Sequence, residues 1–368
     1  MFAQIWISSE KGVIESYSFL EWMINYNGGL TRRGLSGELA ILLQSLLGGQ
    51  HWYWAYFIWL LATLSLFHLA IRIYRFLPDD PALLPLILCP AGLLFAAYDP
   101  EGSIRKEVIG FIAILLVLNG GLASATRIQS MFCWAGIFIF AVGIWIHEAI
   151  VFLLPCFIFT IYLAAGNSNR SFSFVTLVIS GLIVFTFISL WFLLSQPTPN
   201  IEAMCAAVEI RACEYPFKWL EADVISGIKY VIVRRTWTDR WIFAIYALLA
   251  VLPFMMLRIP KTQFKFFLLG GTLSVLGILP LFILGYDWGR WIQMIFLPLC
   301  FVAVYAIASG TISYQRILPA WFNLLYLGSW HLPHAYLHFI PRGILIWPAL
   351  GILFVVQKIR NLVNPNPP

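Results

Sequence analysis

Long apolar runs without a charged side chain dominate the sequence. Residues 172–195 and 291–315 hold 24 and 25 consecutive residues without Asp, Glu, Lys or Arg. A helix needs about 20 such residues to cross the hydrocarbon core of a bilayer, and it satisfies its backbone hydrogen bonds internally. The strands of a membrane β-barrel would instead alternate apolar and polar residues. The pattern therefore predicts an all-α, polytopic integral membrane protein.

The charge-free runs predict about 11 transmembrane helices. A shorter apolar stretch at 39–47 predicts a re-entrant or interfacial helix. Since no internal repeat or linker divides the chain, we expect a single transmembrane domain over residues 1–368, with an outer-face segment at 1–51 and an outer loop at 196–240. The predicted spans lie near residues 52–71, 82–98, 107–126, 130–146, 149–166, 172–195, 241–257, 266–286, 291–309, 317–328 and 342–357.

The composition agrees with a membrane protein. Hydrophobic residues make up 61% of the 368 residues and charged residues 11%, against roughly 45–50% and 25% in soluble proteins. These values exclude a disordered protein, a nucleic-acid module and a water-soluble enzyme of ordinary design. We therefore expect membrane lipids, and no nucleic acid, among the partners.

Lys and Arg are concentrated in one set of alternate loops. These loops carry a net charge of +8, and the rest of the chain carries −2. Because short cytoplasmic loops hold the excess of basic residues, residues 72–81, 258–265 and the C-terminus are predicted to be cytoplasmic. Residues 99–107, 196–240 and 287–290 then lie on the outer side. Residues 1–33 also lie there, which favours a missing first helix over unaided translocation of a short tail.

Two of the six cysteines, Cys205 and Cys213, lie outside the predicted spans. They are eight positions apart in a loop that is expected to face an oxidising compartment. We expect a disulfide between them, which would stabilise the loop by about 2–3 kcal/mol. The alternative is two free thiols on one face of an interfacial helix, too far apart to bond.

Charged residues gather at three tight connections on the predicted outer side. Adjacent guanidiniums among glycines suit bidentate binding of a phosphate or carboxylate. The alternatives are snorkelling arginines in an interfacial turn, a solvated hairpin, and a simple ion pair in the last turn. We expect a substrate-binding role. The candidates are Arg32, Arg33 and Glu38 within 26–38, Asp99, Arg105, Lys106 and Glu107 within 99–107, and Arg290 within 286–291.

Three further residues are candidates for catalysis. His147 and Glu148 interrupt a long apolar stretch, and ionisable groups at such depth usually mark a site. Histidine titrates near neutrality and a glutamate can hold a proton, so the pair suits general acid–base chemistry. A hydrogen-bonded pair that makes the turn between two helices is the alternative. Asp287 could present its carboxylate to sugar hydroxyls, or could simply pair with Arg290.

Other polar groups carry weaker signals. The charged residues within 234–240 could receive an anionic head group or close a loop. His331, His334 and His338 are spaced for one helix face, but Pro333 intrudes and no acidic ligand lies nearby, so interfacial histidines are favoured and no metal is expected. No nucleotide-binding, dinucleotide-binding or zinc-protease motif is present, so no cofactor is expected either.

The segment His147-Glu-Ala-Ile-Val-Phe-Leu-Leu-Pro155, the glycine–arginine turn at 26–38 and Asp287-Trp-Gly-Arg290 resemble motifs of bacterial envelope-glycan enzymes. These are O-antigen and exopolysaccharide repeat polymerases and, more broadly, GT-C glycosyltransferases. The resemblance implies glycosyl transfer or glycan polymerisation outside the cytoplasm, from a polyprenyl-(di)phosphate-linked sugar to a glycan acceptor. It also implies a multi-pass protein of the bacterial inner (cytoplasmic) membrane. GT-C enzymes carry a catalytic acid in the first outer loop, where this chain has Glu10, Glu15 and Glu21 but no paired Asp motif.

Elementary chemistry fits this interpretation. The arginines and Lys106 would hold the phosphate, and one of the three catalytic candidates would deprotonate the acceptor hydroxyl, with fixed cations stabilising the leaving group. The clusters should then share one pocket that continues into an apolar groove for the polyprenyl chain. A transporter or flippase of a lipid-linked or anionic envelope precursor could use the same arginines without chemistry, although such proteins often show repeats and broken helices at the bilayer midplane. A structural subunit of an envelope complex would not need these charges.

Overall fold

The computed structural model describes residues 16–80, 83–99, 102, 104–166, 172–208, 217–222, 224–314 and 320–333. Within these residues the regular secondary structure is helical except for one two-stranded antiparallel sheet, which pairs β1 (Leu257–Arg258) with β2 (Ser313–Tyr314). The predicted span at 342–357, Cys213, His334 and His338 lie outside the described residues.

Seven helical segments of the described chain are long and apolar enough to cross a membrane. The predicted all-α membrane fold is therefore confirmed, whereas the count of 11 spans is not. The seven segments are α4 (His51–Tyr74), α9 (Thr126–Ile146), η4 (Glu148–Leu153) with α10 (Leu154–Gly166), α11 (Phe172–Leu194), α15 (Trp237–Val251) with η5 (Leu252–Met256), α16 (Lys261–Ile278) with α17 (Leu281–Leu284), and α18 (Trp288–Ala308).

Shorter helices account for other predicted segments. The stretch at 39–47 lies in α3, the run at 107–126 contains α8, and the run at 317–328 overlaps α19. The remaining short elements lie in the N-terminal segment, between α4 and α8, and between α11 and α15. The short elements are α2 (Tyr17–Leu20), η2 (Glu21–Met23), α3 (Leu35–Leu47), α5 (Leu84–Leu88), α6 (Phe95–Tyr98), α8 (Val108–Gly121), α12 (Ile201–Val208), α14 (Val224–Arg234) and α19 (Ala320–Ser329).

The prediction of one continuous span at 82–98 is wrong. The structure has α5 and α6 there, separated by residues 89–94. Cys89 precedes Pro90 and has an extended backbone, with φ −52° and ψ 135°. A residue before proline is disfavoured in helical geometry, so α5 ends at this point.

Helices α8 and α18 form the centre of the bundle. In α18, 83% of the most apolar 18-residue stretch is buried, against 22% in the segment formed by α16 and α17. Helix α8 packs against α4, α9, α10 and α18, and most of its side chains are buried. The helices around this centre expose large apolar side chains, for example Phe138 and Trp191, as expected for a surface that faces lipid.

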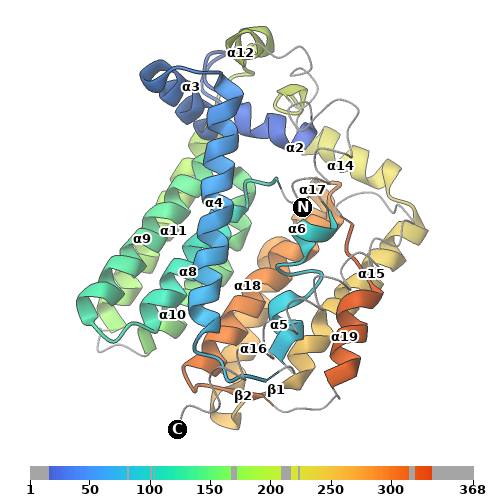
Figure 1. Ribbon diagram of the computed structural model, residues 1–368. Coiled ribbons are helices and arrows are strands. Elements are labelled where there is room, and N and C mark those ends of the chain that lie inside the picture. Colours follow the sequence, from blue (N-terminus) through green and yellow to red (C-terminus); the bar gives the residue numbers. More distant parts are fainter. Residues whose placement is uncertain are drawn as a thin grey trace.

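The two ends of the bundle differ (Figure 1). Helices α2, α3, α12 and α14 lie at one end, called here the α12 end, and β1 and β2 lie at the opposite end, called the sheet end. The basic connections after α4 and before α16 are at the sheet end.

We expect the sheet end to face the cytoplasm. Thr262 and Glu202 are exposed at the sheet end and at the α12 end, respectively. A membrane-impermeant maleimide added to intact spheroplasts should label the Glu202→Cys variant and leave the Thr262→Cys variant unlabelled until the membrane is opened. Efficient labelling of Thr262→Cys from outside would reverse the orientation.

Cys205 lies in α12 and is disulfide-bonded. Because Cys213 lies outside the described residues, the pairing of these two residues stays a prediction. The other four cysteines are not disulfide-bonded.

Candidate functional site

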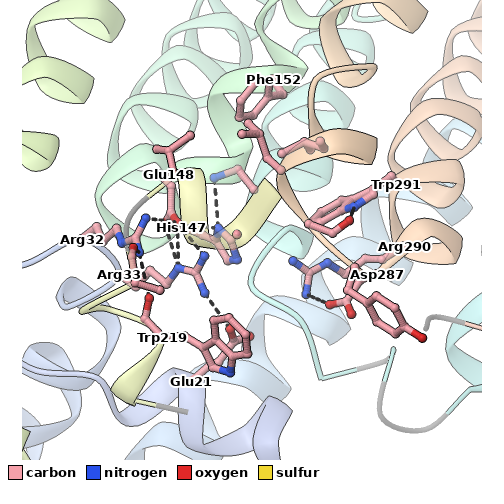
Figure 2. A pocket seen from close by; sticks show the side chains of 18 of the residues that line it. Glu21, Arg32, Arg33, His147, Glu148, Phe152, Trp219, Asp287, Arg290 and Trp291 are labelled. Carbon is pink, nitrogen blue, oxygen red and sulfur yellow. Dashed lines mark hydrogen bonds and ion pairs between the residues drawn. The ribbon is translucent and has the colours of Figure 1, made fainter. Parts of the chain in front are cut away.

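Four segments far apart in the sequence meet at the α12 end. They are residues 17–33, residues 104–107 before α8, the junction of α9 and η4, and the turn before α18. Figure 2 labels residues of the first, third and fourth segments. The junction forms because His147 has an extended backbone, with φ −157° and ψ 116°, which ends α9. Each segment contributes charged side chains where helices begin or end.

Arg33 and Arg105 connect three carboxylates. The Arg33 guanidinium donates to Glu148 through Nε at 2.9 Å and Nη2 at 2.6 Å, and through Nη1 to Glu21 at 2.8 Å. Arg105 donates to the other oxygen of Glu21 at 2.9 Å and lies 3.6 Å from Oδ2 of Asp287. A bidentate pair of this kind is among the stronger ionic contacts in proteins.

Further contacts lead from Asp287 back to Glu148. Asp287 Oδ2 lies 2.9 Å from Arg290 Nη1, and Arg290 Nε lies 3.1 Å from Glu107 Oε1. His147 then lies between Glu107, at 3.5 Å, and Glu148, at 3.6 Å. The result is a closed circuit, called here the polar ring. Its members are Glu21, Arg33, Arg105, Glu107, His147, Glu148, Asp287 and Arg290.

The arginines of this ring favour the ionised form of Glu21. Burial alone would raise the pKa of its carboxyl group, but Arg105 and Arg33 outweigh that effect and lower the pKa to about 2. Its side chain is only 2% exposed. A buried charge is tolerated when paired, and removing one partner is costly, so Glu21 fixes the relative positions of both arginines.

His147 is held as a neutral imidazole. Its Nδ1 accepts a hydrogen bond from the Ala149 backbone N–H at 3.0 Å, so the ring proton belongs on Nε2, which faces Glu107. Burial lowers the pKa of His147 to about 4 despite the nearby carboxylates Glu107 and Glu148. Both ring nitrogens are therefore directed at protein groups.

We expect acid to weaken the fold through His147. Its pKa falls from 6.5 to about 4 on folding, so the unfolded chain binds more protons between these values. The free energy of unfolding should then decrease by about 3 kcal/mol as the pH falls from 6.5 to 4. Unfolding of the purified protein in micelles at several pH values measures this slope.

The matched control is His147→Gln. The amide oxygen can accept from Ala149 and the amide nitrogen can face Glu107, but the side chain does not titrate. The variant should lose most of the slope above about pH 5.5, where the lowered pKa values of Glu21, Glu107 and Glu148 do not yet contribute. An unchanged slope would show that other groups cause the acid sensitivity.

Lys106 supports the turn at Arg33. Arg33 has a positive φ of 70°, which is rare outside glycine and is sustained only by surrounding contacts. The Lys106 Nζ donates to the Arg33 carbonyl oxygen at 2.7 Å from a fully buried position. Burial lowers the pKa of Lys106 to about 7. Lys106 therefore positions Arg33, and it does not line the cavity described next.

A cavity of about 430 Å³ lies against the polar ring. One wall consists of charged ring members together with Arg32, and the other of apolar side chains from η4, α11, α14 and α17. Trp219, Tyr230 and Tyr286 also line it, with Trp219 against Tyr230 and Tyr230 against Tyr286 at ring-centroid distances of 5.3 and 5.6 Å. Such a cavity suits an amphiphilic ligand, with a charged part and an apolar part.

Arg32 and Asp287 are the most accessible charges of the site. Their side chains are 22% and 23% exposed, whereas that of Glu148 is 13% exposed. Arg32 donates to the backbone oxygens of Trp219 and Ala222 and lies 3.8 Å from Glu148. Both arginine contacts of Asp287 use the same oxygen, Oδ2.

The structure brings most of the candidate residues together. Seven of them line the cavity, and Lys106 and Glu107 lie directly behind it. Glu38 and Asp99 do not line it: Glu38 accepts a hydrogen bond from the Tyr26 N–H, and Asp99 accepts one from the Gly102 N–H. The cavity-lining candidates are Arg32, Arg33, Arg105, His147, Glu148, Asp287 and Arg290.

Some residues of the site were not among the candidates. The sequence shows Glu21 as one of the acids in the first outer segment, but it carries no signal that Glu21 contacts Arg33 and Arg105. Trp219 belongs to a hydrophilic loop and carries no motif. Arg235, one of the weaker signals, donates to the Tyr286 carbonyl oxygen and lies over the Tyr286 ring, so it fastens α14 to the turn before α18.

Comparisons with known proteins identify a family. The family model described as uncharacterised membrane protein Rv1490 matches residues 1–242. The match includes the segments that carry Glu21, Arg33, Arg105 and His147, and it ends before Asp287. No curated protein and no solved structure matches the chain.

Proposed function

This chain belongs to the Rv1490 family of membrane proteins, and we propose that it transfers a glycosyl group from a polyprenyl-(di)phosphate-linked sugar to a glycan acceptor. The observation that carries the proposal is the cavity, in which accessible Arg32 and Asp287 face the same space as an apolar wall. A lipid-linked sugar phosphate has a part for each of them: a phosphate for Arg32, a sugar beside Asp287 and an isoprenoid chain for the apolar wall. The excess of basic residues at the sheet end supports a reaction on the extracytoplasmic side.

Asp287 is the proposed base. Its carboxylate takes the proton of the acceptor hydroxyl, the hydroxyl oxygen forms a bond to the anomeric carbon, and the bond from that carbon to the phosphate oxygen breaks. The electron pair leaves with the lipid phosphate. Arg105 and Arg290 beside Asp287 favour its ionised form, so the base needs no prior deprotonation.

Geometry favours Asp287 over the other two catalytic candidates. His147 has Nδ1 occupied by Ala149 and Nε2 directed at Glu107. Glu148 is less exposed than Asp287 and is bound by three guanidinium contacts from Arg33. We therefore assign His147 and Glu148 to positioning of Arg33 and of the ring.

Arg32 is the proposed phosphate ligand. It is the most exposed guanidinium of the site, and its hydrogen bonds go to backbone oxygens that water can replace. An arriving phosphate would take over these donors in a bidentate contact. Fixed positive charge at the leaving group is typically a large catalytic contribution. Arg32→Lys should therefore weaken transfer although the charge is kept.

A strain that lacks the gene tests the proposal. A transferase of this kind leaves its lipid-linked sugar on the outer leaflet when it is absent, and the mature surface glycan changes. We expect the lipid-linked sugar to accumulate on the outer leaflet of this strain, where an impermeant periodate reagent oxidises it in intact spheroplasts. Lipid-linked sugar protected until the membrane is opened would indicate a flippase instead, and an unaltered glycan and lipid profile would contradict both.

A further inference from the structure

The apolar wall of the cavity continues to the outer surface of the bundle. Leu194 of α11 and Val224 of α14 both line the cavity, yet they are 54% and 56% exposed. A side chain that meets both conditions stands where the cavity reaches the surface. Leu190, one turn before Leu194 on the same helix, lines the cavity and is partly buried.

Large apolar side chains are exposed next to each of these two residues. Trp191 beside Leu194 on α11 is 78% exposed, and Ile225 beside Val224 is 61% exposed. On a membrane protein, the exposed apolar side chains of a spanning helix such as α11 face lipid and not water. The cavity therefore meets hydrocarbon on its α11 side, whereas exposed Glu221, Ser226 and Lys229 show that the start of α14 lies where the surface becomes polar.

The opposite side of α14 is closed. A Cβ atom at Gly227 would lie 3.3 Å from the Leu284 carbonyl oxygen, so α14 and α17 approach each other at backbone distance. Arg235 fastens the end of α14 to Tyr286 on that same side. Among the described residues that line the cavity, the exposed ones are Leu194 and Val224, which places the opening between α11 and α14.

We infer that the cavity opens laterally to the bilayer between the end of α11 and the start of α14, and that this opening binds the isoprenoid chain of the lipid-linked substrate. The inference rests on the proposed function, which supplies the phosphate and sugar ends of the ligand. A cavity of about 430 Å³ is at the small end of ligand cavities, so it would hold the head group and the first part of the chain, and the rest of the chain would lie in the bilayer. A phospholipid would bring two acyl chains to the same opening.

Photocrosslinking from within the cavity tests the inference. Benzoylphenylalanine is placed at Leu190, at Val224 and, as the matched control, at Ile283, which is exposed on α17 and does not line the cavity. The full-length protein is reconstituted in phosphatidylethanolamine–phosphatidylglycerol vesicles that contain undecaprenyl monophosphate. Mass spectrometry then identifies the lipid attached at each position.

We expect undecaprenyl phosphate to be attached at positions 190 and 224 at least about tenfold above its share of the vesicle lipid, a preference of about 1.4 kcal/mol. Position 283 should give phospholipid adducts in proportion to composition. The inference would be overturned if position 190 gave phospholipid adducts alone. It would also be overturned if positions 190 and 224 gave no lipid adduct while position 283 did. If such a protein still restores the surface glycan in the deletion strain, the chain-binding site is wrong and the proposed function stands.

Discussion

Replacing Asp287 by Asn is expected to lower glycosyl transfer at least about 100-fold, because the amide cannot accept the proton of the acceptor hydroxyl. The fold should be kept. Arg105 retains Glu21 at 2.9 Å and Arg290 retains Glu107 at 3.1 Å, so neither guanidinium is left without a carboxylate. Surface glycan restored by the variant in the deletion strain, normalised to the amount of folded protein in the membrane, measures the effect.

Asp79→Asn is the matched control. Asp79 is exposed in the connection after α4. This connection is at the sheet end, opposite the α12 end (Figure 1). This variant should restore the glycan as the unchanged protein does. Full restoration by Asp287→Asn as well would remove Asp287 from the reaction.

The largest effect on stability is expected from Arg33→Ala. Arg33 neutralises Glu148 and Glu21, which are 13% and 2% exposed, and its removal leaves both carboxylates without their closest cation. Breaking a buried ion pair on one side costs about 3–5 kcal/mol. Reversible unfolding in mixed micelles at neutral pH measures the loss.

Two further variants test whether the stability cost comes from the polar ring or from the loss of any charged side chain. Arg32→Ala removes a guanidinium that donates mainly to backbone oxygens, so it should cost only about 1 kcal/mol. The double variant Arg33→Ala/Glu148→Ala removes both partners, and its cost should be smaller than the sum of the single costs. Strict additivity would show that Arg33 and Glu148 do not depend on each other.

Much of the fold can be predicted because the bilayer imposes strong local rules. A charge-free run of about 20 residues has few alternatives to a transmembrane helix, and α4, α9, α11 and α18 follow from such runs. The break between α5 and α6 was also encoded locally, in Cys89-Pro90. The apolar run outweighed that signal, and the expectation of a continuous span failed there.

The site is harder to predict because its order depends on tertiary contacts. The candidates Arg33, Arg105 and Glu148 were recognisable as charges that should not lie beside a membrane. Their arrangement into a ring depends on Glu21, whose partner Arg105 is 84 residues away in sequence. Exposure, which separates Asp287 from His147, is likewise a property of the folded chain and not of a motif.

The most direct test of the proposed reaction uses the lipid-linked sugar that accumulates in the deletion strain. That lipid is extracted and reconstituted in vesicles with the purified protein, and surface glycan from the same strain is added as acceptor. The proposed mechanism predicts that the unchanged protein releases polyprenyl phosphate or diphosphate and extends the acceptor, whereas Asp287→Asn does neither. Movement of the lipid-linked sugar across the vesicle membrane, with its sugar–phosphate bond intact, would contradict glycosyl transfer.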